Sequence, residues 1–325
     1  MLRTGEAVSA AVVGAPDNDW AARIERMLVH TGDPWNWQNS ELLRRDCGVA
    51  ANFFVLQREG APFANIMLVE TAGVALLGHV WTAPADRGGG ASSILMERAM
   101  DDFATRGGRA IFLGTEFDST AWRYYQRRGF EPVEPGSGYM EFHRQPRAEF
   151  ERGWFGAKET IIEPLDWPHW PAAAPLCLGD FGDVVRLAAV RLIGRRSSEE
   201  PLLTLIREAR RQHAAGAPPP AFVLRDANGP AVLGVACRQP HPLWPGTEIL
   251  DVFCHPRWWR RGADLIAALP RAGASRTIAY ADANQTEKRA AFEGAGLRET
   301  TVLPRWVRRA AAGSERVDVS VFASD

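Results

Sequence analysis

Three consecutive glycines, Gly88 to Gly90, lie between a run of apolar residues and a helical pattern. Glycine permits positive φ and close backbone approach, so several N–H groups can converge on an anion at the start of the following helix. The helix dipole also favours negative charge there. The stretch from Thr82 to Ser93 therefore predicts a phosphate-binding turn. Because a glycine-rich turn is also typical of a simple tight connection, this prediction depends on features elsewhere in the chain.

Length and composition favour two globular domains. The chain has 325 residues, of which 46% are apolar and 24% are charged, as in ordinary soluble proteins. A formal net charge of -1 gives no electrostatic reason to expect nucleic acid or a membrane surface as a partner. No apolar run approaches the ~20 residues of a membrane span. We therefore expect a soluble protein, either a monomer or a homodimer.

The cysteines favour a reduced, metal-free protein. Cys47, Cys177, Cys237 and Cys254 are widely spaced and form no CxxC pair, which argues against a zinc site and a disulfide framework. A cytoplasmic location fits reduced thiols. Residues 8–15 could pass for the apolar core of a signal peptide, but an acidic residue interrupts the basic flank and the run fits a first strand equally well.

Around the glycine turn, the pattern predicts a mixed sheet with flanking helices. Apolar periodicity and turn residues predict strands at 8–14, 52–57, 63–70 and 74–82, the last being nearly all apolar and so central. Leu95, Met96, Ala99 and Phe103 form one face of the helix after the turn. Residues 110–114 then predict a short strand parallel to 74–82.

The remaining elements of this half follow from caps and turns. Asp17 or Asn18 can cap a first helix, and Ser119 or Thr120 can cap another that ends at Gly129. Two closing strands are expected at 130–133 and 139–142. Residues 33–37 have turn chemistry with two tryptophans, which predicts a loop that closes over a ligand or packs on the core. The polar stretch 145–158 predicts a domain boundary.

The second half repeats this order of elements, which indicates an internal duplication. Helices are predicted at 180–195, 199–212, 263–269 and 286–296, and strands at 160–162, 221–225, 232–238, 249–254, 277–281 and 317–322. The predicted fold is α/β, an α+β mixed sheet with flanking helices in each of two tandem domains, 1–148 and 149–325. Aromatic and proline residues at 166–171 predict packing between the halves or a wall of an acceptor pocket.

Residues 1–145 contain two motifs that are similar to motifs of a known protein superfamily. Arg87-Gly88-Gly89-Gly90-Ala91-Ser92 resembles the pyrophosphate-binding turn Gln/Arg-x-x-Gly-x-Gly/Ala of the GNAT superfamily of acyl-CoA-dependent N-acyltransferases. Ser92 is the one departure. Residues 121–130, with Tyr125 followed by Gly129 and Phe130, are similar to the Ala-x-x-x-Tyr-x-x-x-Gly-Phe motif of that superfamily. Both motifs stand in the family's order and on the expected elements.

The resemblance implies an N-acyltransferase that uses acetyl-CoA or another short acyl-CoA as co-substrate. Acyl transfer needs a held diphosphate, a polarised thioester carbonyl, a neutral amine and a proton for the departing thiolate. The implied cofactor-binding residues are Val80 and Thr82, whose backbone would polarise the carbonyl, and Arg87, Gly88, Gly89, Gly90, Ala91 and Ser92, which would hold the diphosphate.

Tyr125 is the candidate general acid, with Tyr124 one position away. Candidates for the general base are His79, on the strand that enters the turn, and Glu116 and Asp118, after the next parallel strand. A strand histidine is also typical of a hydrogen-bonded core group, and an aspartate at position 118 also fits a helix cap.

The second half departs from the family pattern. When the two halves are aligned on the prolines of their turns, Trp259 corresponds to Arg87 and Asp264 corresponds to Ser92. The aspartate would place negative charge in a phosphate site. Phe292 replaces Tyr125 and has no proton to donate. This half therefore resembles a degenerate GNAT domain with a structural or pocket-forming role. Its arginines 257, 260 and 261 could bind phosphate, but a solvated basic loop is the simpler interpretation.

Two other classes of function remain open. The protein could bind or sense acyl-CoA without catalysis, or it could use His79 with Thr82 or Thr115 to hydrolyse or decarboxylate an acyl-CoA. For an N-acyltransferase, the expected acceptor is a small-molecule or peptide amine. Acceptor loops are the variable part of this fold, so the sequence does not name the acceptor.

Overall fold

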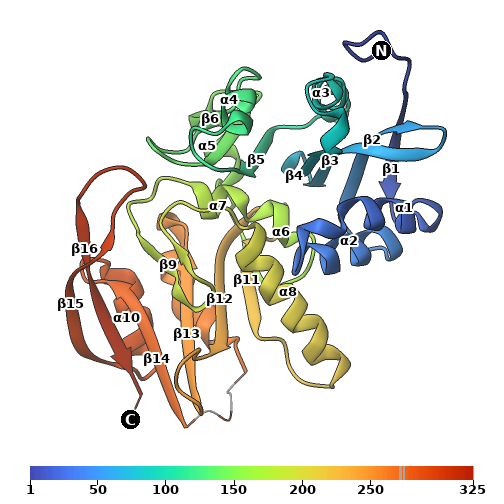
Figure 1. Cartoon of the computed structure of the whole chain (residues 1–325). Helices are drawn as coiled ribbons and strands as arrows, with labels where there is room; N and C mark the ends of the chain where they lie inside the picture. The colour runs from blue at the N-terminus through green and yellow to red at the C-terminus, as the bar shows by residue number, and fades with distance from the viewer. Residues whose placement is uncertain (271–272, 274, 325) are drawn as a thin grey trace. The chain divides into compact units, whose positions relative to one another are not determined.

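The chain forms two seven-stranded mixed sheets with flanking helices (Figure 1), which confirms the predicted α/β class. The computed structural model describes residues 1–270, 273 and 275–324. The first sheet has the order β1 (Ser9–Ala15), β2 (Ala50–Arg58), β3 (Ala61–Thr71), β4 (Val74–Thr82), β5 (Ala110–Gly114), β7 (Tyr139–His143) and β6 (Glu131–Pro132). The second has the order β8 (Thr160–Pro164), β11 (Ala221–Asp226), β12 (Val232–Pro240), β13 (Thr247–Cys254), β14 (Arg276–Asp282), β16 (Arg316–Ala323) and β15 (Arg298–Arg308). In both sheets the strands lie side by side in their order along the chain, except that the last two are exchanged. This shared order is expected for tandem copies.

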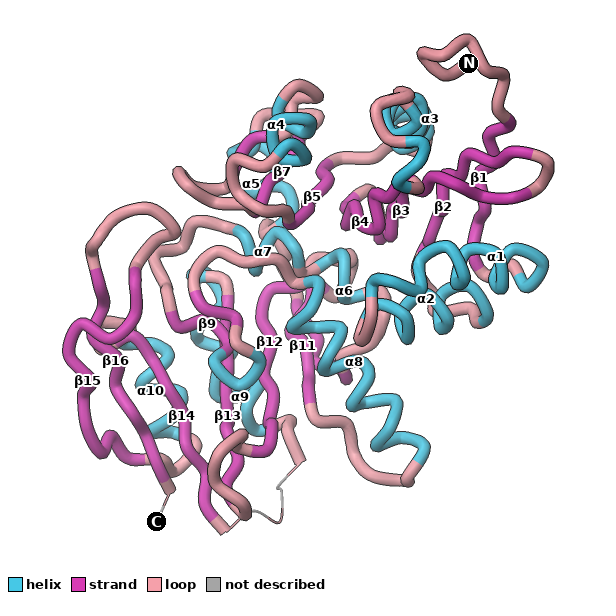
Figure 2. The backbone as a smooth tube through the Cα atoms, viewed as in Figure 1, coloured by secondary structure: helices cyan, strands magenta, loops and turns pink. Residues whose placement is uncertain are grey.

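Helices connect these strands (Figure 2). The α-helices are α1 (Asn18–Leu28), α2 (Trp35–Arg44), α3 (Ala91–Thr105), α4 (Thr120–Gln126), α5 (Arg147–Trp154), α6 (His169–Ala172), α7 (Ala174–Leu178), α8 (Glu199–Ala214), α9 (Gly262–Ala267) and α10 (Thr286–Gly294). Short 3-10 turns are η1 (Val29–Thr31), η2 (Pro84–Asp86), η3 (Ala188–Val190) and η4 (Pro256–Arg261), and β9 (Val185–Leu187) pairs with β10 (Leu192–Ile193).

Packing divides the chain into two compact units. The first unit contains Met1–Leu113 and Phe142–Gln145, and the second contains Gly114–Glu141 and Pro146–Asp325. The division at 148/149 stays a prediction. The stretch 145–158, predicted to be a boundary, contains helix α5, whose buried Phe150 and Trp154 give it an apolar face.

In the first unit, β1 to β4 form an antiparallel meander and β5 pairs parallel to β4. Helix α3 connects these parallel strands and packs against β2, β3 and β4. Leu95, Met96, Ala99 and Phe103 are each at most 1% exposed, which confirms the predicted apolar face. The Asp17 side chain accepts hydrogen bonds from two N–H groups at the start of α1, so the predicted cap is confirmed.

The interpretation of residues 33–37 as a loop is wrong in part, because α2 begins at Trp35. Pro34 occupies its N-cap position, where a missing N–H costs nothing. The helix buries Leu42 and Leu43 and packs against α1. Burial of this face stabilises the helix, although the local residues favour a turn.

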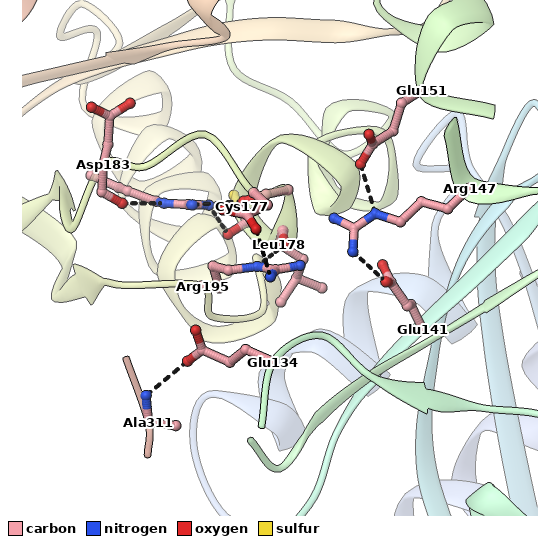
Figure 3. Close-up of polar contacts among 12 residues, drawn as sticks. Glu134, Glu141, Arg147, Glu151, Cys177, Leu178, Asp183, Arg195 and Ala311 are labelled. Atoms are coloured by element: carbon pink, nitrogen blue, oxygen red, sulfur yellow. Dashed lines mark hydrogen bonds and ion pairs between the residues drawn. The ribbon is translucent and has the colours of Figure 1, made fainter. Parts of the chain in front are cut away.

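In the second unit, charged contacts join residues 114–141 to the following chain. Arg147 of α5 donates to Glu141 of β7 at 2.7 Å and to Glu151 at 2.9 Å (Figure 3). Glu134, between β6 and β7, accepts a hydrogen bond of 2.9 Å from the Ala311 N–H between β15 and β16. These contacts explain why 114–141 belong to this unit.

The predicted helix at 180–195 is wrong, and β9, η3 and β10 occupy this stretch. The N–H groups of Val184 and Val185 donate to the Asp282 carboxylate at 2.7 and 2.9 Å. Arg191 adopts the left-handed conformation with φ 60°, which a continuous helix does not allow. A side chain distant in the sequence therefore provides the hydrogen bonds that a helix would otherwise supply.

A buried ion pair fixes this segment to the second sheet. Lys288 of α10 is 1% exposed and its Nζ lies 2.7 Å from Oδ1 of Asp251, which is fully buried on β13. The same Nζ donates to the carbonyls of Val185 and Arg186, each at 2.9 Å. Oδ2 of Asp251 accepts from the Ala189 N–H at 3.3 Å. All three protons of the ammonium group thus have acceptors.

Replacing Lys288 with Met should lower the free energy of unfolding by ~3–5 kcal/mol, because it leaves the Asp251 carboxylate buried without its cation. Urea unfolding followed by circular dichroism measures the loss. The double variant K288M/D251N should recover part of it, because the uncompensated charge is then gone. Lys158→Met, at the exposed second lysine, is the matched control. Equal stability of K288M and K158M would contradict this account.

Candidate functional site

The glycine turn joins β4 to α3 in the first unit. Gly88 and Gly90 have φ of 81° and 89°, in the left-handed region that glycine adopts without strain. Within the part of the chain that the structure describes, the N–H groups of Gly88, Gly90 and Ala91 donate no hydrogen bond. Free N–H groups at the start of a 15-residue helix form a site suited to an anion.

Charged residues surround and support this turn. Arg87 is exposed, and its Nε donates to the Thr82 carbonyl at 3.2 Å. Asp86 pairs with Arg58 of β2 at 2.7 Å. The Arg3 N–H donates to the Gly89 carbonyl at 2.9 Å, and the Arg3 side chain lies against Gly90. No local pattern predicts a role for Arg3, because its contact with the turn joins residues far apart in the sequence.

A β-bulge interrupts β4 just before the turn. Asn65 pairs with Trp81 and Met67 with Gly78, so Ile66 faces the two residues 79 and 80. His79 has a positive φ of 49°, and its carbonyl accepts a hydrogen bond from Nδ2 of Asn65 at 2.9 Å. A bulge leaves one residue outside the regular ladder of hydrogen bonds. This irregularity falls at residues 79 and 80, directly before the end of β4.

His79 contacts helix α2. Its Nε2 donates to Oε1 of Gln38 at 3.1 Å, and its ring meets the edge of Trp35 at a centroid distance of 6.1 Å. Burial lowers the pKa of His79 to about 4, and nearby His30 lowers it further. His79 is therefore neutral at physiological pH and is a weak base.

Tyr125 lies on α4 in the second unit and is 6% exposed. Its ring packs against Tyr124 and Phe130 with centroid distances of 5.5 and 5.8 Å. Burial raises the pKa of Tyr125, and Tyr124 and Glu199 raise it further. Its hydroxyl therefore keeps its proton at neutral pH. Tyr124 is instead covered by the Arg128 guanidinium, 3.6 Å from the ring centroid.

The two acidic candidates that follow β5 are both exposed. Asp118, with a positive φ of 57°, forms a bidentate contact with Arg123 of α4 at 2.8 and 3.1 Å. The cap of α4 is Ser119, whose Oγ accepts from the Trp122 N–H at 3.1 Å. Asp118 thus neutralises a cation rather than capping the helix.

A third carboxylate, which sequence reasoning missed, lies at the end of β5. Oε2 of Glu199, the first residue of α8, lies 3.7 Å from the position that a Cβ would take on Gly114, the last residue of β5. The same position is 3.2 Å from the Tyr139 ring. An acidic residue at the start of a helix gives only a capping signal, so the sequence could not distinguish it.

The counterpart of the glycine turn in the second half has a different backbone. Gly262, which matches Gly90, has a right-handed φ of -62° and starts α9. Trp258 and Trp259 are buried, and Asp264 pairs with Arg261 at 2.7 Å. Phe292, which matches Tyr125, is fully buried. This turn lacks the left-handed glycines that open the first one.

The bulge is also absent from the second copy. The ladder between β12 and β13 runs from Gly234↔Cys254 to Pro240↔Glu248 without a shift. Asp251, which corresponds to His79 when counted back from the turn, instead forms the buried pair with Lys288. The second copy has thus replaced both backbone features of the first by internal contacts.

The aromatic segment after β8 is part of the core of the second unit. Trp167 and Trp170 are fully buried, with ring centroids 5.7 Å apart. Trp170 donates to the Glu199 carbonyl at 3.0 Å and so holds the start of α8. These residues pack within the second unit, while packing between the halves and a wall of an acceptor pocket stay predictions.

The described ranges contain neither a cluster of metal ligands nor a helix suited to cross a membrane. In residues 1–270, 273 and 275–324, no group of three or more His, Cys, Asp or Glu side chains is arranged to hold a metal ion. No helix in these ranges has the length and apolar character needed to cross a bilayer. The four cysteines are buried and unpaired by disulfides.

Solved structures with some similarity to this chain are acetyltransferases. The ribosomal-protein-S18-alanine N-acetyltransferase from Escherichia coli is 15% identical, over 51% of this chain and 93% of that one, with a TM-score of 0.33. A GNAT family acetyltransferase from Brucella melitensis in complex with acetyl-CoA is 16% identical, over 42% and 90%, with a TM-score of 0.33. One from Staphylococcus aureus Mu50 is 12% identical, over 42% and 100%, with a TM-score of 0.35.

The sequence model of the acetyltransferase (GNAT) family matches residues 7–130. No curated protein matches the chain. The matched range contains both the glycine turn and the motif around Tyr125. Residues 7–130 of this chain are therefore similar to the acetyltransferase (GNAT) family, over less than half of the chain.

Proposed function

We propose that the protein transfers an acetyl or other short acyl group from acyl-CoA to the amine of a small molecule or peptide. The observation that carries this proposal is the glycine turn of a GNAT family domain, with left-handed Gly88 and Gly90 and free N–H groups at the start of α3. Proteins of this family in known complexes hold CoA or acetyl-CoA.

The glycine turn would bind the diphosphate of CoA. N–H groups from Gly88 to Ser92 would donate to phosphate oxygens, and the dipole of α3 would favour their charge. Arg87 is exposed and would add a charge-assisted hydrogen bond. Arg3, which lies against Gly90, would supply further positive charge.

The bulge in β4 would polarise the thioester. Its extra residue lies outside the ladder between β3 and β4, so a backbone N–H near Val80 can point at the carbonyl oxygen. The Thr82 backbone follows at the end of the strand. A fixed donor of this kind stabilises the negative charge that develops on the oxygen during attack.

Tyr125 would protonate the departing thiolate. Its raised pKa keeps the phenol protonated, and among the described residues its hydroxyl has no hydrogen-bond partner. His79, Glu116 and Asp118 are the sequence-derived candidates for the base that neutralises the amine. The C-terminal copy would support the N-terminal domain without binding CoA itself.

Purified protein should release CoA thiol from acetyl-CoA only when an amine acceptor is present. A panel of small amines and peptides, assayed by a thiol-reactive dye, tests this. Thiol or carbon dioxide release without any amine would instead indicate a hydrolase or decarboxylase. Acetyl-CoA binding without turnover on any amine would indicate a sensing protein.

Arg87→Ala should weaken acetyl-CoA binding about 10- to 100-fold, because it removes one charge-assisted hydrogen bond to phosphate. Isothermal titration calorimetry measures the change. The control is Arg260→Ala, which removes an exposed arginine from the matching turn of the second half and should leave affinity unchanged. A larger loss in R260A than in R87A would assign CoA to the other copy.

Tyr125→Phe should lower kcat about 100-fold with acetyl-CoA affinity retained, because only the donated proton is removed. Steady-state thiol release and calorimetry on the same preparation separate the two quantities. Tyr124→Phe, at the neighbouring ring under Arg128, should keep most of the activity. Unchanged turnover in Y125F would remove this tyrosine from the mechanism.

A further inference from the structure

We infer that the acceptor of this protein is an arylamine, an amine whose nitrogen is bonded to an aromatic ring, and that aromatic side chains at the end of β4 bind that ring. This inference rests on the proposed acyltransferase function and names the class of acceptor. The side chains are His30, Trp35, His79 and Trp81, which we call the aromatic cluster. All four lie in the first unit together with the glycine turn.

The aromatic cluster joins the connection between α1 and α2 to the end of β4. His30 of η1 lies against Trp81 with a centroid distance of 5.2 Å. Trp35, the first residue of α2, meets the edge of His79 at 6.1 Å. His79 lies in the bulge of β4, and Trp81 pairs with Asn65 directly after it. The cluster therefore adjoins the end of β4 from which the glycine turn starts.

The end of β4 is open where the cluster lies. Residues 74–77 of this strand are buried, whereas residues 78–82 are all partly exposed. The parallel pairing with β5 ends at Leu76, so within the described residues the later part of β4 pairs with β3 alone. Trp35 is also partly exposed, and His30 is exposed. Ligands of open α/β sheets bind beyond the carboxyl ends of the strands, so the rings of the cluster can contact a bound molecule.

The charges around the cluster do not favour an acceptor with several ammonium groups. Glu25 of α1, Glu41 of α2 and Glu70 of β3 each pair with an arginine. Asp19, at the start of α1, and Asp33, before α2, are exposed. Strand β4 itself contains no acidic residue. The cluster thus presents aromatic rings without a carboxylate among its members, and such rings favour a flat apolar group.

One ring nitrogen of the cluster is prepared to accept a hydrogen bond from the amino group of the acceptor. Gln38 is fully buried and donates its amide to Sδ of Met67 at 3.2 Å. Its Oε1 therefore faces His79 and accepts from Nε2 at 3.1 Å. With the proton on Nε2, Nδ1 of His79 carries a lone pair. Among the described residues, Nδ1 has no hydrogen-bond partner and remains accessible.

The basicity of His79 matches an arylamine. Burial lowers its pKa to about 4, so at neutral pH the ring is a hydrogen-bond acceptor rather than a strong base. An alkylamine is an ammonium ion at that pH and needs a stronger base before it can attack. An arylamine is already neutral, because its nitrogen lone pair is conjugated with the ring. It can therefore attack a thioester directly.

The transfer to an arylamine balances without a strong base. The neutral nitrogen attacks the thioester carbonyl carbon and forms the C–N bond, while the C–S bond breaks and its electron pair stays on sulfur. The nitrogen loses one proton, which passes through Nδ1 of His79 to water, and the sulfur takes up one proton. One arylamine and one thioester thus give one anilide and one thiol, with no proton released overall.

A panel of amines with acetyl-CoA as the donor tests the acceptor class. Aniline is aromatic and uncharged, benzylamine is aromatic and charged, cyclohexylamine is charged without an aromatic ring, and spermidine is a polycation. Aniline should have a kcat/KM at neutral pH at least ~10-fold above each of the others, because it alone combines the ring with a neutral nitrogen. Any of the other amines reaching the value for aniline would overturn the inference.

Trp35→Leu and Trp81→Leu test the binding site. Each should raise KM for aniline about 10-fold, with kcat and acetyl-CoA affinity retained, because an aromatic contact with the acceptor is lost. Trp35→Phe should recover part of the loss, since it keeps a ring. Trp20→Leu is the matched control, because this indole lies on α1 under the Arg23 guanidinium, 3.7 Å from the ring centroid, and outside the cluster.

Each outcome bears on one proposal. Absence of amine-dependent thiol release in the wild type would overturn the proposed function, whereas release with ring-free amines alone would overturn only the acceptor class. An unchanged KM for aniline in both W35L and W81L would overturn the role of the cluster. A raised KM in Asp33→Asn, with W35L and W81L unaffected, would instead assign acceptor binding to charge. If the tryptophan variants lose thermal stability, the order of kcat/KM in the wild type still decides the acceptor class.

Discussion

A pair of parallel strands joined by a helix determines the N-terminal domain. Parallel strands cannot be connected by a hairpin, so α3 must cross from β4 to β5 and begin at the carboxyl end of β4. The glycine turn at this junction gives α3 a start with free N–H groups, and the bulge in β4 directly precedes it. Topology therefore brings the glycine turn and the bulge to the same end of β4.

The second copy shows what happens when these features are replaced. β13 and β14 are also parallel and pair over the same length, three residues on each strand, as β4 and β5 do. However, the ladder into β13 has no bulge, and Asp251 and Lys288 bind backbone groups of residues 185, 186 and 189. The second half thus has internal contacts where the first half has a bulge and a turn with free N–H groups.

Local signals predicted much of the fold, and long-range contacts account for the rest. The bounds 74–82 and 110–114 follow from apolar runs, the first followed by Ala83-Pro84 and the second ended by Gly114, and β4 and β5 have these bounds. β15 was missed because its residues are mostly exposed and show no apolar alternation. The helix predicted at 180–195 was wrong because Asp282 supplies its backbone partner from a distance. Glu199 was predicted only as the start of a helix, since nothing local places it beside Gly114.

The central claim is that the N-terminal copy binds acyl-CoA and the C-terminal copy does not. A crystal structure of the protein with CoA tests this most directly. The account predicts one CoA per chain, with its diphosphate on the N–H groups of Gly88 to Ser92 and no CoA at residues 256–262. CoA bound at the second turn, or bound equally at both, would contradict the account.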